Sequence, residues 1–199
     1  MTIKSLSFTI TGVRPLLLNN PQCVDRFNGF TKRIKIINDK KTRRTEEDYL
    51  ELADLEVASK LYFNEELGVY VPTSWVTEAI ASTAFKVAKV SKATIRGSLF
   101  AVEAKTKLSY DGMNTVKEAS DIVKNPKFRH SMILPQQQVR INKAFPVFHK
   151  WSFSLDLEYD DSQIDRDSVV RVLNHCATYG GFGDFRPTFG RASCEVTNG

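Results

Sequence analysis

The feature that most constrains the fold is a strict alternation of apolar and polar residues from 150 to 159. The apolar positions are Trp151, Phe153, Leu155, Leu157 and Tyr159. Because successive side chains of a strand point to opposite faces, this pattern predicts a half-buried strand with one solvated face. A stripe of apolar residues at helical spacing follows from about 165 to 179. It ends at two glycines, which are typical of a helix C-terminus.

The remaining segments supply matching elements. An alternating stretch opens the chain at 3–11, a helical pattern covers about 74–87, and a last strand is predicted at 191–196. With the strand and helix near 150–179, this order favours an α+β protein. The fold class that fits it is a ferredoxin-like (RRM-like) βαββαβ core with long insertions.

We expect one domain over 1–199, because this length suits a single hydrophobic core. Turn residues without a clean period predict an inserted basic loop at about 19–44, and a second insertion is expected at about 98–145. Thr45, followed three residues later by Asp48, is an acidic variant of the capping box. It predicts the start of a helix that runs to about residue 60.

The positive charge of the chain is concentrated in the predicted loop. The net charge is +5, and residues 32–44 carry +6 of charge while the remainder sums to −1. The cations are Lys32, Arg33, Lys35, Lys40, Lys41, Arg43 and Arg44. Clustered cations favour a polyanionic partner, because each phosphate contact releases condensed counterions. The alternative is a solvated, partly disordered loop.

A second candidate region is the glycine-rich segment between the last helix and the last strand. It contains Gly180, Gly181, Phe182, Gly183, Phe185, Arg186, Phe189, Gly190 and Arg191. Glycines allow positive φ and close backbone approach, so main-chain N–H groups of such a turn can face a phosphate. Arginines supply charge-assisted contacts and phenylalanines can stack on bases. The alternative is a helix cap followed by a tight connection. Arg140 and Lys143 are further candidates to extend a binding groove.

Other classes of protein are disfavoured. The three cysteines, Cys23, Cys176 and Cys194, lack the spacing of a metal site, so we expect reduced thiols, no metal and no cofactor. There is no P-loop, GxGxxG, GxSxG or HExxH motif. No apolar run approaches 18 residues, and the first residues lack the pattern of a signal peptide. We therefore expect a cytoplasmic protein without a membrane partner.

Three stretches resemble the repeat-associated mysterious proteins, the RAMP superfamily of RNA-binding proteins that includes backbone subunits of CRISPR effector complexes. They are the strand and proline-marked turn at 11–18, the segment Tyr70 to Trp75 that opens a helix, and the turn from Gly180 to Arg191. The chain also resembles uncharacterised phage and prophage proteins with this layout. The resemblance implies RNA binding and side-by-side assembly of subunits along the strand.

The resemblance also bears on catalysis. In some family members an aspartate in the loop after the first strand cleaves bound RNA, and Asp25 is the candidate at that place. The sequence departs from the family at Asn19, Asn20 and Pro21, and in the residues after Ser74. Another branch uses a histidine base, for which His130, His149 and His175 show no diagnostic spacing. The residues favour binding over catalysis.

Three hypotheses follow. The first is a subunit that binds single-stranded RNA or DNA, alone, as a homo-oligomer or within a CRISPR-like complex. The second is a phage-encoded protein that mimics a backbone subunit and inhibits host defence in the host cytoplasm. The third is a ribonuclease, with or without a metal ion. The first hypothesis predicts that the basic segment and the glycine-rich turn converge on one concave face.

Overall fold

The computed structural model describes residues 2–136 and 139–198, so residues 137 and 138 of the predicted insertion lie outside the described residues. The chain divides into two compact units, where one domain was expected. Unit 1 contains the segments 1–16, 69–111 and 149–199, and unit 2 contains 17–68 and 112–148. The two expected insertions thus belong largely to one compact unit, in which the helix α2 (Glu46–Lys60) contacts both α1 (Gly29–Asp39) and β8 (Val139–Phe148). In the described part of the chain no helix is both long and apolar enough to cross a membrane.

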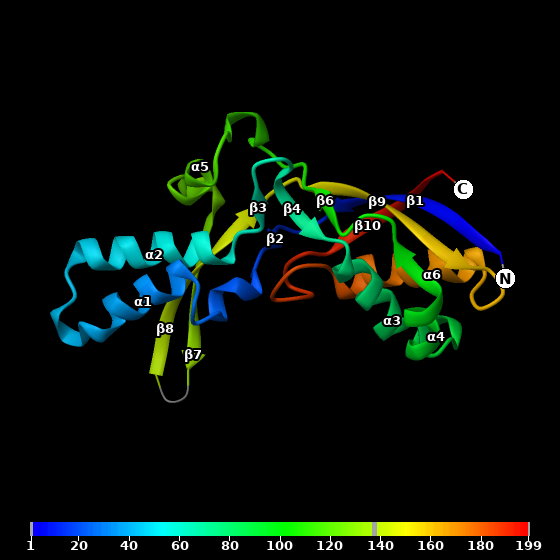
Figure 1. The fold of residues 1–199 in the computed structure, drawn as a ribbon, viewed down its shortest axis with the longest axis horizontal. Helices are drawn as coiled ribbons and strands as arrows, with labels where there is room; N and C mark the ends of the chain where they lie inside the picture. Colours follow the sequence, from blue (N-terminus) through cyan, green and yellow to red (C-terminus); the bar gives the residue numbers. More distant parts are fainter. Residues whose placement is uncertain (1, 137–138, 199) are drawn as a thin grey trace. The chain divides into compact units, whose positions relative to one another are not determined.

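Unit 1 is built on an antiparallel sheet with the strand order β10-β1-β9-β5 (Figure 1). The strands are β1 (Ile3–Gly12), β5 (Leu99–Ala101), β9 (Ser152–Asp160) and β10 (Ala192–Asn198). The helices are α3 (Ser74–Ala88), α4 (Lys92–Ser98) and α6 (Arg166–His175), and α6 continues into a π-helical turn over Cys176–Gly180. A second antiparallel pair is formed by β4 (Gly68–Pro72) and β6 (Lys105–Lys107).

One face of this sheet is apolar and the other is polar. In the register of β1 and β9, Phe8 lies opposite Leu155, and both are buried. On the other face Thr9 lies opposite Ser154, and their hydroxyls are 2.9 Å apart. The helices α3 and α6 supply further buried apolar residues to the core, among them Val76, Ile80, Val169 and Val172. The predicted alternation of β9 is confirmed.

Unit 2 combines a helical pair with a β-hairpin (Figure 1). Its longer elements are α1 (Gly29–Asp39), α2 (Glu46–Lys60), α5 (Ala119–Val123), β7 (Arg129–Gln136) and β8 (Val139–Phe148). Short elements are η1 (Pro21–Val24), η2 (Lys41–Arg43), β3 (Phe63–Asn64), η3 (Met113–Thr115) and η4 (Pro126–Phe128). The strand β2 (Leu16–Leu17) lies at the boundary of the two units.

The prediction of a loop over 19–44 is wrong for most of this segment, because residues 29–39 form α1 and residues 41–43 form η2. The helix α1 begins at Asn28, whose side chain accepts a hydrogen bond from the Phe30 N–H (2.8 Å). Ile37 is fully buried, and α1 packs along α2. Packing of an apolar side against a neighbour supplies most of the stability of a helix in a protein, so cations on the other side are compatible with helix formation. The predicted capping box of α2, by contrast, is confirmed at Thr45 and Asp48.

Candidate nucleic-acid interface

The seven predicted cations of residues 32–44 fall into two groups in unit 2. Four of them are exposed and form no ion pair within the described residues, and we call these the α1–η2 basic surface. Its members are Lys32, Lys35, Lys41 and Arg43. Lys32 and Lys35 are three residues apart and therefore neighbours on the surface of α1. This set of charges is available to an anionic ligand.

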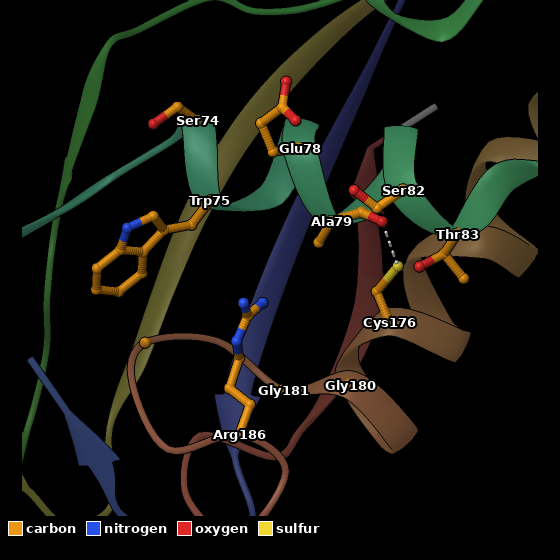
Figure 2. Close-up of a pocket in the computed structure, with 11 residues that line it drawn as sticks. Ser74, Trp75, Glu78, Ala79, Ser82, Thr83, Cys176, Gly180, Gly181 and Arg186 are labelled. Atoms are coloured by element: carbon orange, nitrogen blue, oxygen red, sulfur yellow. Dashed lines mark hydrogen bonds between the residues drawn. The ribbon is translucent and has the colours of Figure 1, made fainter. Parts of the chain in front are cut away.

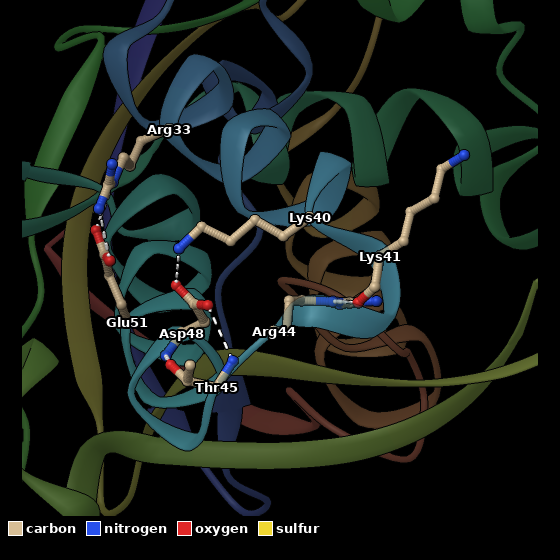
Figure 3. Close-up of polar contacts among 7 residues, drawn as sticks. All are labelled: Arg33, Lys40, Lys41, Arg44, Thr45, Asp48 and Glu51. Carbon is tan, nitrogen blue, oxygen red and sulfur yellow. Dashed lines mark hydrogen bonds and ion pairs between the residues drawn. The ribbon is translucent and has the colours of Figure 1, made fainter.

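The other cations of the segment are engaged inside unit 2 (Figure 3). Arg33 makes two hydrogen bonds to the carboxylate of Glu51, at 2.6 and 2.8 Å, and this guanidinium lowers the pKa of Glu51. Lys40 Nζ lies 2.5 Å from Asp48 Oδ1, which lowers the pKa of the Asp48 carboxyl. Arg44 donates to the Lys41 carbonyl (3.0 Å), and its guanidinium lies over the ring of Tyr49 at 5.2 Å. These contacts stabilise the helical pair.

The two candidates on β8 also differ. Arg140 is exposed near the end of the hairpin. Lys143 Nζ is 2.5 Å from Oε1 of the buried Glu56, whose other oxygen accepts from the Ala144 N–H at 2.7 Å. Lys60 then donates to the Ala144 carbonyl at 2.5 Å. Lys143 is therefore part of the clamp between α2 and β8, and Arg140 alone of the two extends into solvent.

The glycine-rich turn lies in unit 1, and several of its backbone N–H groups form hydrogen bonds within the protein. The amides of Gly181, Phe182 and Gly190 donate to the carbonyls of Cys176, Gly190 and Pro15, at 2.7, 2.9 and 2.8 Å. Phe182 is fully buried and packs edge-on against Phe153. These amides are therefore occupied within the protein, and Phe182 is a core residue rather than a platform for a base.

Two glycines of the turn are required by close contacts. Gly190 has a φ of +74°, and a Cβ there would lie 1.7 Å from the Phe182 carbonyl oxygen. Gly181 has a φ of +78°, and its Cβ would lie 2.9 Å from the backbone of Gly190. Gly183 also has positive φ, at +76°. The tight connection that the sequence left open as an alternative thus accounts for the positions of Gly181 and Gly190.

Arg186 is the exposed cation of the turn, and it lines a cavity of about 380 Å³ beside α3. Figure 2 shows its guanidinium pointing toward α3, between the turn and the side chain of Trp75. Glu78 also lines this cavity and is held by Arg96 through two hydrogen bonds of 2.9 and 2.8 Å. Trp75 was not among the candidate binding residues of the sequence, because it lies on the helical apolar pattern of α3. The cavity therefore combines an aromatic ring with charges of both signs.

Cys176 borders the same cavity. Its Sγ donates to the Ala79 carbonyl at 3.3 Å (Figure 2), and burial raises the pKa of this thiol. Burial likewise raises the pKa of Cys194 to about 12. Since the thiolate is the reactive form, neither group is suited to nucleophilic chemistry at neutral pH.

The candidate catalytic residues have ordinary structural partners. Asp25 is exposed, and its Oδ1 accepts a hydrogen bond from the Phe27 N–H (2.9 Å). The ring of His175 lies 4.9 Å from that of Tyr179 in unit 1, whereas His130 belongs to β7 of unit 2. Among the described residues no group of three or more His, Cys, Asp or Glu side chains is arranged to hold a metal ion.

The structure assigns the basic segment to unit 2 and the glycine-rich turn to unit 1. Their convergence on one concave face stays a prediction. No family model and no curated protein matches the sequence. Among solved structures, the crystal structure of Cmr6 from Pyrococcus furiosus matches with a TM-score of 0.35 and 9% identity, over 97% of this chain and 99% of that one. A TM-score of this size does not establish a common fold.

Proposed function

We propose that this protein binds single-stranded nucleic acid, with RNA as the expected ligand, through phosphate contacts of the α1–η2 basic surface. The observation that carries the proposal is that Lys32, Lys35, Lys41 and Arg43 are exposed and form no ion pair within the described residues. Binding of phosphates by such cations releases counterions, so the affinity must fall as salt rises. Arg140 belongs to the same unit and adds to this charge.

The polar face of the unit 1 sheet is not part of the proposed interface. RRM domains stack bases on aromatic side chains of this kind of face. Here the corresponding positions of β9 are Ser154, Asp156 and Glu158, which are exposed. Glu195 on β10 lies opposite Thr9 of β1 and adds a third carboxylate. Carboxylates repel phosphates, so the ligand is expected to avoid this face.

The core of unit 1 is, in the same proposal, the ferredoxin-like scaffold of a RAMP-type subunit. The strand order β10-β1-β9-β5, with α3 between β1 and β5 in sequence and α6 between β9 and β10, supports this assignment. Side-by-side assembly along one strand is the form of binding expected of such a subunit. Lengthening the RNA would then add protein copies in steps, which sedimentation of the complexes measures.

The test is a series of binding measurements in rising salt with a labelled oligouridylate. The variant Lys32→Gln, Lys35→Gln, Lys41→Gln, Arg43→Gln should bind more weakly, and its slope of log affinity against log salt should be shallower by about 3. The matched control removes four exposed lysines from outside residues 29–44: Lys86→Gln, Lys107→Gln, Lys117→Gln and Lys124→Gln. It has the same net charge as the test variant. Equal slopes for the two variants, or an affinity that does not change with salt, would contradict the proposal.

A further inference from the structure

Unit 1 has a second cleft that is also lined by residues of the glycine-rich turn. It has a volume of about 610 Å³ and is lined by Arg14, Thr178, Tyr179, Pro187, Thr188 and Arg191. The cavity beside α3 is lined by the neighbouring residues Gly180 and Arg186, so the two cavities flank one stretch of backbone. Arg14 and Tyr179 were not among the candidate binding residues of the sequence, although Arg14 lies in the stretch 11–18 that carries the family resemblance.

Main-chain hydrogen bonds hold the two arginines of this cleft next to each other. The N–H groups of Val13 and Arg14 both donate to the Arg191 carbonyl, at 2.8 and 3.0 Å. The Arg14 carbonyl accepts from Trp151 Nε1 at 2.7 Å. Arg191 Nε donates to the Thr178 carbonyl at 2.9 Å. The guanidinium of Arg191 is thereby oriented by one of its five donors, and the other four form no hydrogen bond within the described residues.

The charge of the cleft is of one sign. Arg14 is exposed and Arg191 is half-buried, and neither forms an ion pair with a carboxylate in the described part of unit 1. None of the six lining residues is acidic. The cavity beside α3 differs, because Glu78 is part of its wall. Two guanidinium groups in one cleft without a carboxylate favour an anion, and their planar forks suit the oxygens of a phosphate.

An aromatic ring is presented beside these cations. Tyr179 is 67% exposed, which is high for a residue of its size in a folded domain. Its ring contacts that of His175, with centroids 4.9 Å apart and planes inclined by 47°. This contact restricts rotation of the tyrosine while leaving most of its surface open. A restrained, exposed ring in the same cleft as two arginines suits stacking on a base of a single strand.

We propose that this cleft binds one nucleotide of the single-stranded ligand, with its phosphate between Arg14 and Arg191 and its base on Tyr179. The proposal rests on the proposed function, since it adds a second contact region to it. It concerns different residues, however, and they lie in unit 1 whereas the α1–η2 basic surface lies in unit 2. In this proposal the hydroxyl of Thr188, which also lines the cleft, donates to the same phosphate.

The test is photochemical crosslinking of the full chain to an oligouridylate that contains 4-thiouridine, followed by mass spectrometry of the peptides. We expect an adduct on Tyr179 that is lost in Tyr179→Leu. Phe85 serves as the matched control, because it is 64% exposed and lies outside the cleft, on α3. Phe85→Leu should leave the adducts unchanged. Binding should weaken about tenfold in Tyr179→Leu.

A second variant tests the phosphate contact. Arg14→Gln removes a side chain, whereas the fold uses only the backbone of Arg14, so the melting temperature should stay close to that of the unchanged protein. The slope of log affinity against log salt should fall by about 0.7, and the yield of the Tyr179 adduct should drop.

The outcomes separate the two proposals. Salt-dependent binding with adducts confined to residues 29–44 would overturn the nucleotide cleft and leave the function in place. An unchanged yield of the Tyr179 adduct in Arg14→Gln would contradict the proposal that one nucleotide contacts both Arg14 and Tyr179. A failure of the protein to bind the oligouridylate at any salt would overturn both.

Discussion

The basic segment of unit 2 and the glycine-rich turn of unit 1 were both identified from composition, and the structure treats them differently. In the basic segment the fold uses some of the side chains. Arg33 and Lys40 form ion pairs with carboxylates of α2, whereas the side chains of Lys32 and Lys35 are exposed and form no ion pair within the described residues. In the glycine-rich turn the fold uses the backbone, because the N–H groups of Gly181 and Gly190 donate hydrogen bonds to carbonyls of the protein itself. A run of cations therefore overstates the charge available to a ligand, and a run of glycines overstates the amides available to it.

The largest expected effect concerns the backbone of the turn. Gly190→Ala should destabilise the protein by at least about 3 kcal/mol, because the new Cβ meets the Phe182 carbonyl at 1.7 Å and the φ of +74° disfavours alanine. Gly180→Ala is the matched control, since a Cβ at Gly180 meets nothing within 4 Å. Urea denaturation measures both. If the two variants unfold at the same urea concentration, the turn is not constrained in the way described.

The next effect concerns the clamp between α2 and β8. Glu56→Gln should lower the free energy of unfolding by about 2 kcal/mol, because an amide replaces the buried carboxylate that pairs with the half-buried Lys143. Glu51→Gln is the surface counterpart, because it removes the carboxylate that pairs with Arg33 where both side chains are partly exposed. It should change the unfolding midpoint little. A larger shift of the unfolding midpoint for Glu51→Gln than for Glu56→Gln would contradict the conclusion that the Glu56 contact contributes more to stability.

A smaller effect separates the two groups of cations by ligand affinity. The pair Lys32→Gln, Lys35→Gln should weaken oligouridylate binding about tenfold at moderate salt, since both side chains are open. The pair Arg33→Gln, Lys40→Gln removes the same charge from α1 and the residue that follows it, but should weaken binding less, because those side chains already hold Glu51 and Asp48. Fluorescence anisotropy measures both. An equal loss would show that net charge, and not availability, determines binding.

These differences explain what the sequence could and could not predict. The strand β9 and the helix α6 follow from local periodicity, which needs no knowledge of the rest of the chain. The helix α1 was missed although Phe30, Ile34 and Ile37 recur at helical spacing, because the cations between them were interpreted as a loop. The apolar period was the better guide, since packing against α2 decides whether α1 forms.

The candidate site was predicted less completely than the fold. The pairing of Arg33 with Glu51 joins residues of two different helices, and that of Lys143 with Glu56 joins a strand and a helix. Neither spacing leaves a local pattern. Arg14 and Arg191 come together only because β1 and β10 are neighbours in the sheet. Sequence analysis therefore found the charged segments, but it could not tell which charges the fold itself would use.

The smallest expected effect is a dependence of stability on pH that arises from Asp48, the carboxylate paired with Lys40. The hydrogen bond from Lys40 lowers the pKa of Asp48 most in the folded protein, and the hydrogen bond from the Thr45 N–H lowers it further. A carboxyl with a lowered folded pKa contributes its full stability above its unfolded pKa, near 3.9, and loses it as the pH falls through the folded value. The destabilisation caused by Asp48→Asn at neutral pH should therefore shrink below about pH 4. Thermal unfolding at several pH values measures it, with Asp39→Asn as the control, because Asp39 is exposed and forms no ion pair within the described residues. If the difference in stability between Asp48→Asn and the unchanged protein stays constant from neutral to acid pH, the charge of Asp48 does not contribute to the stability of α2.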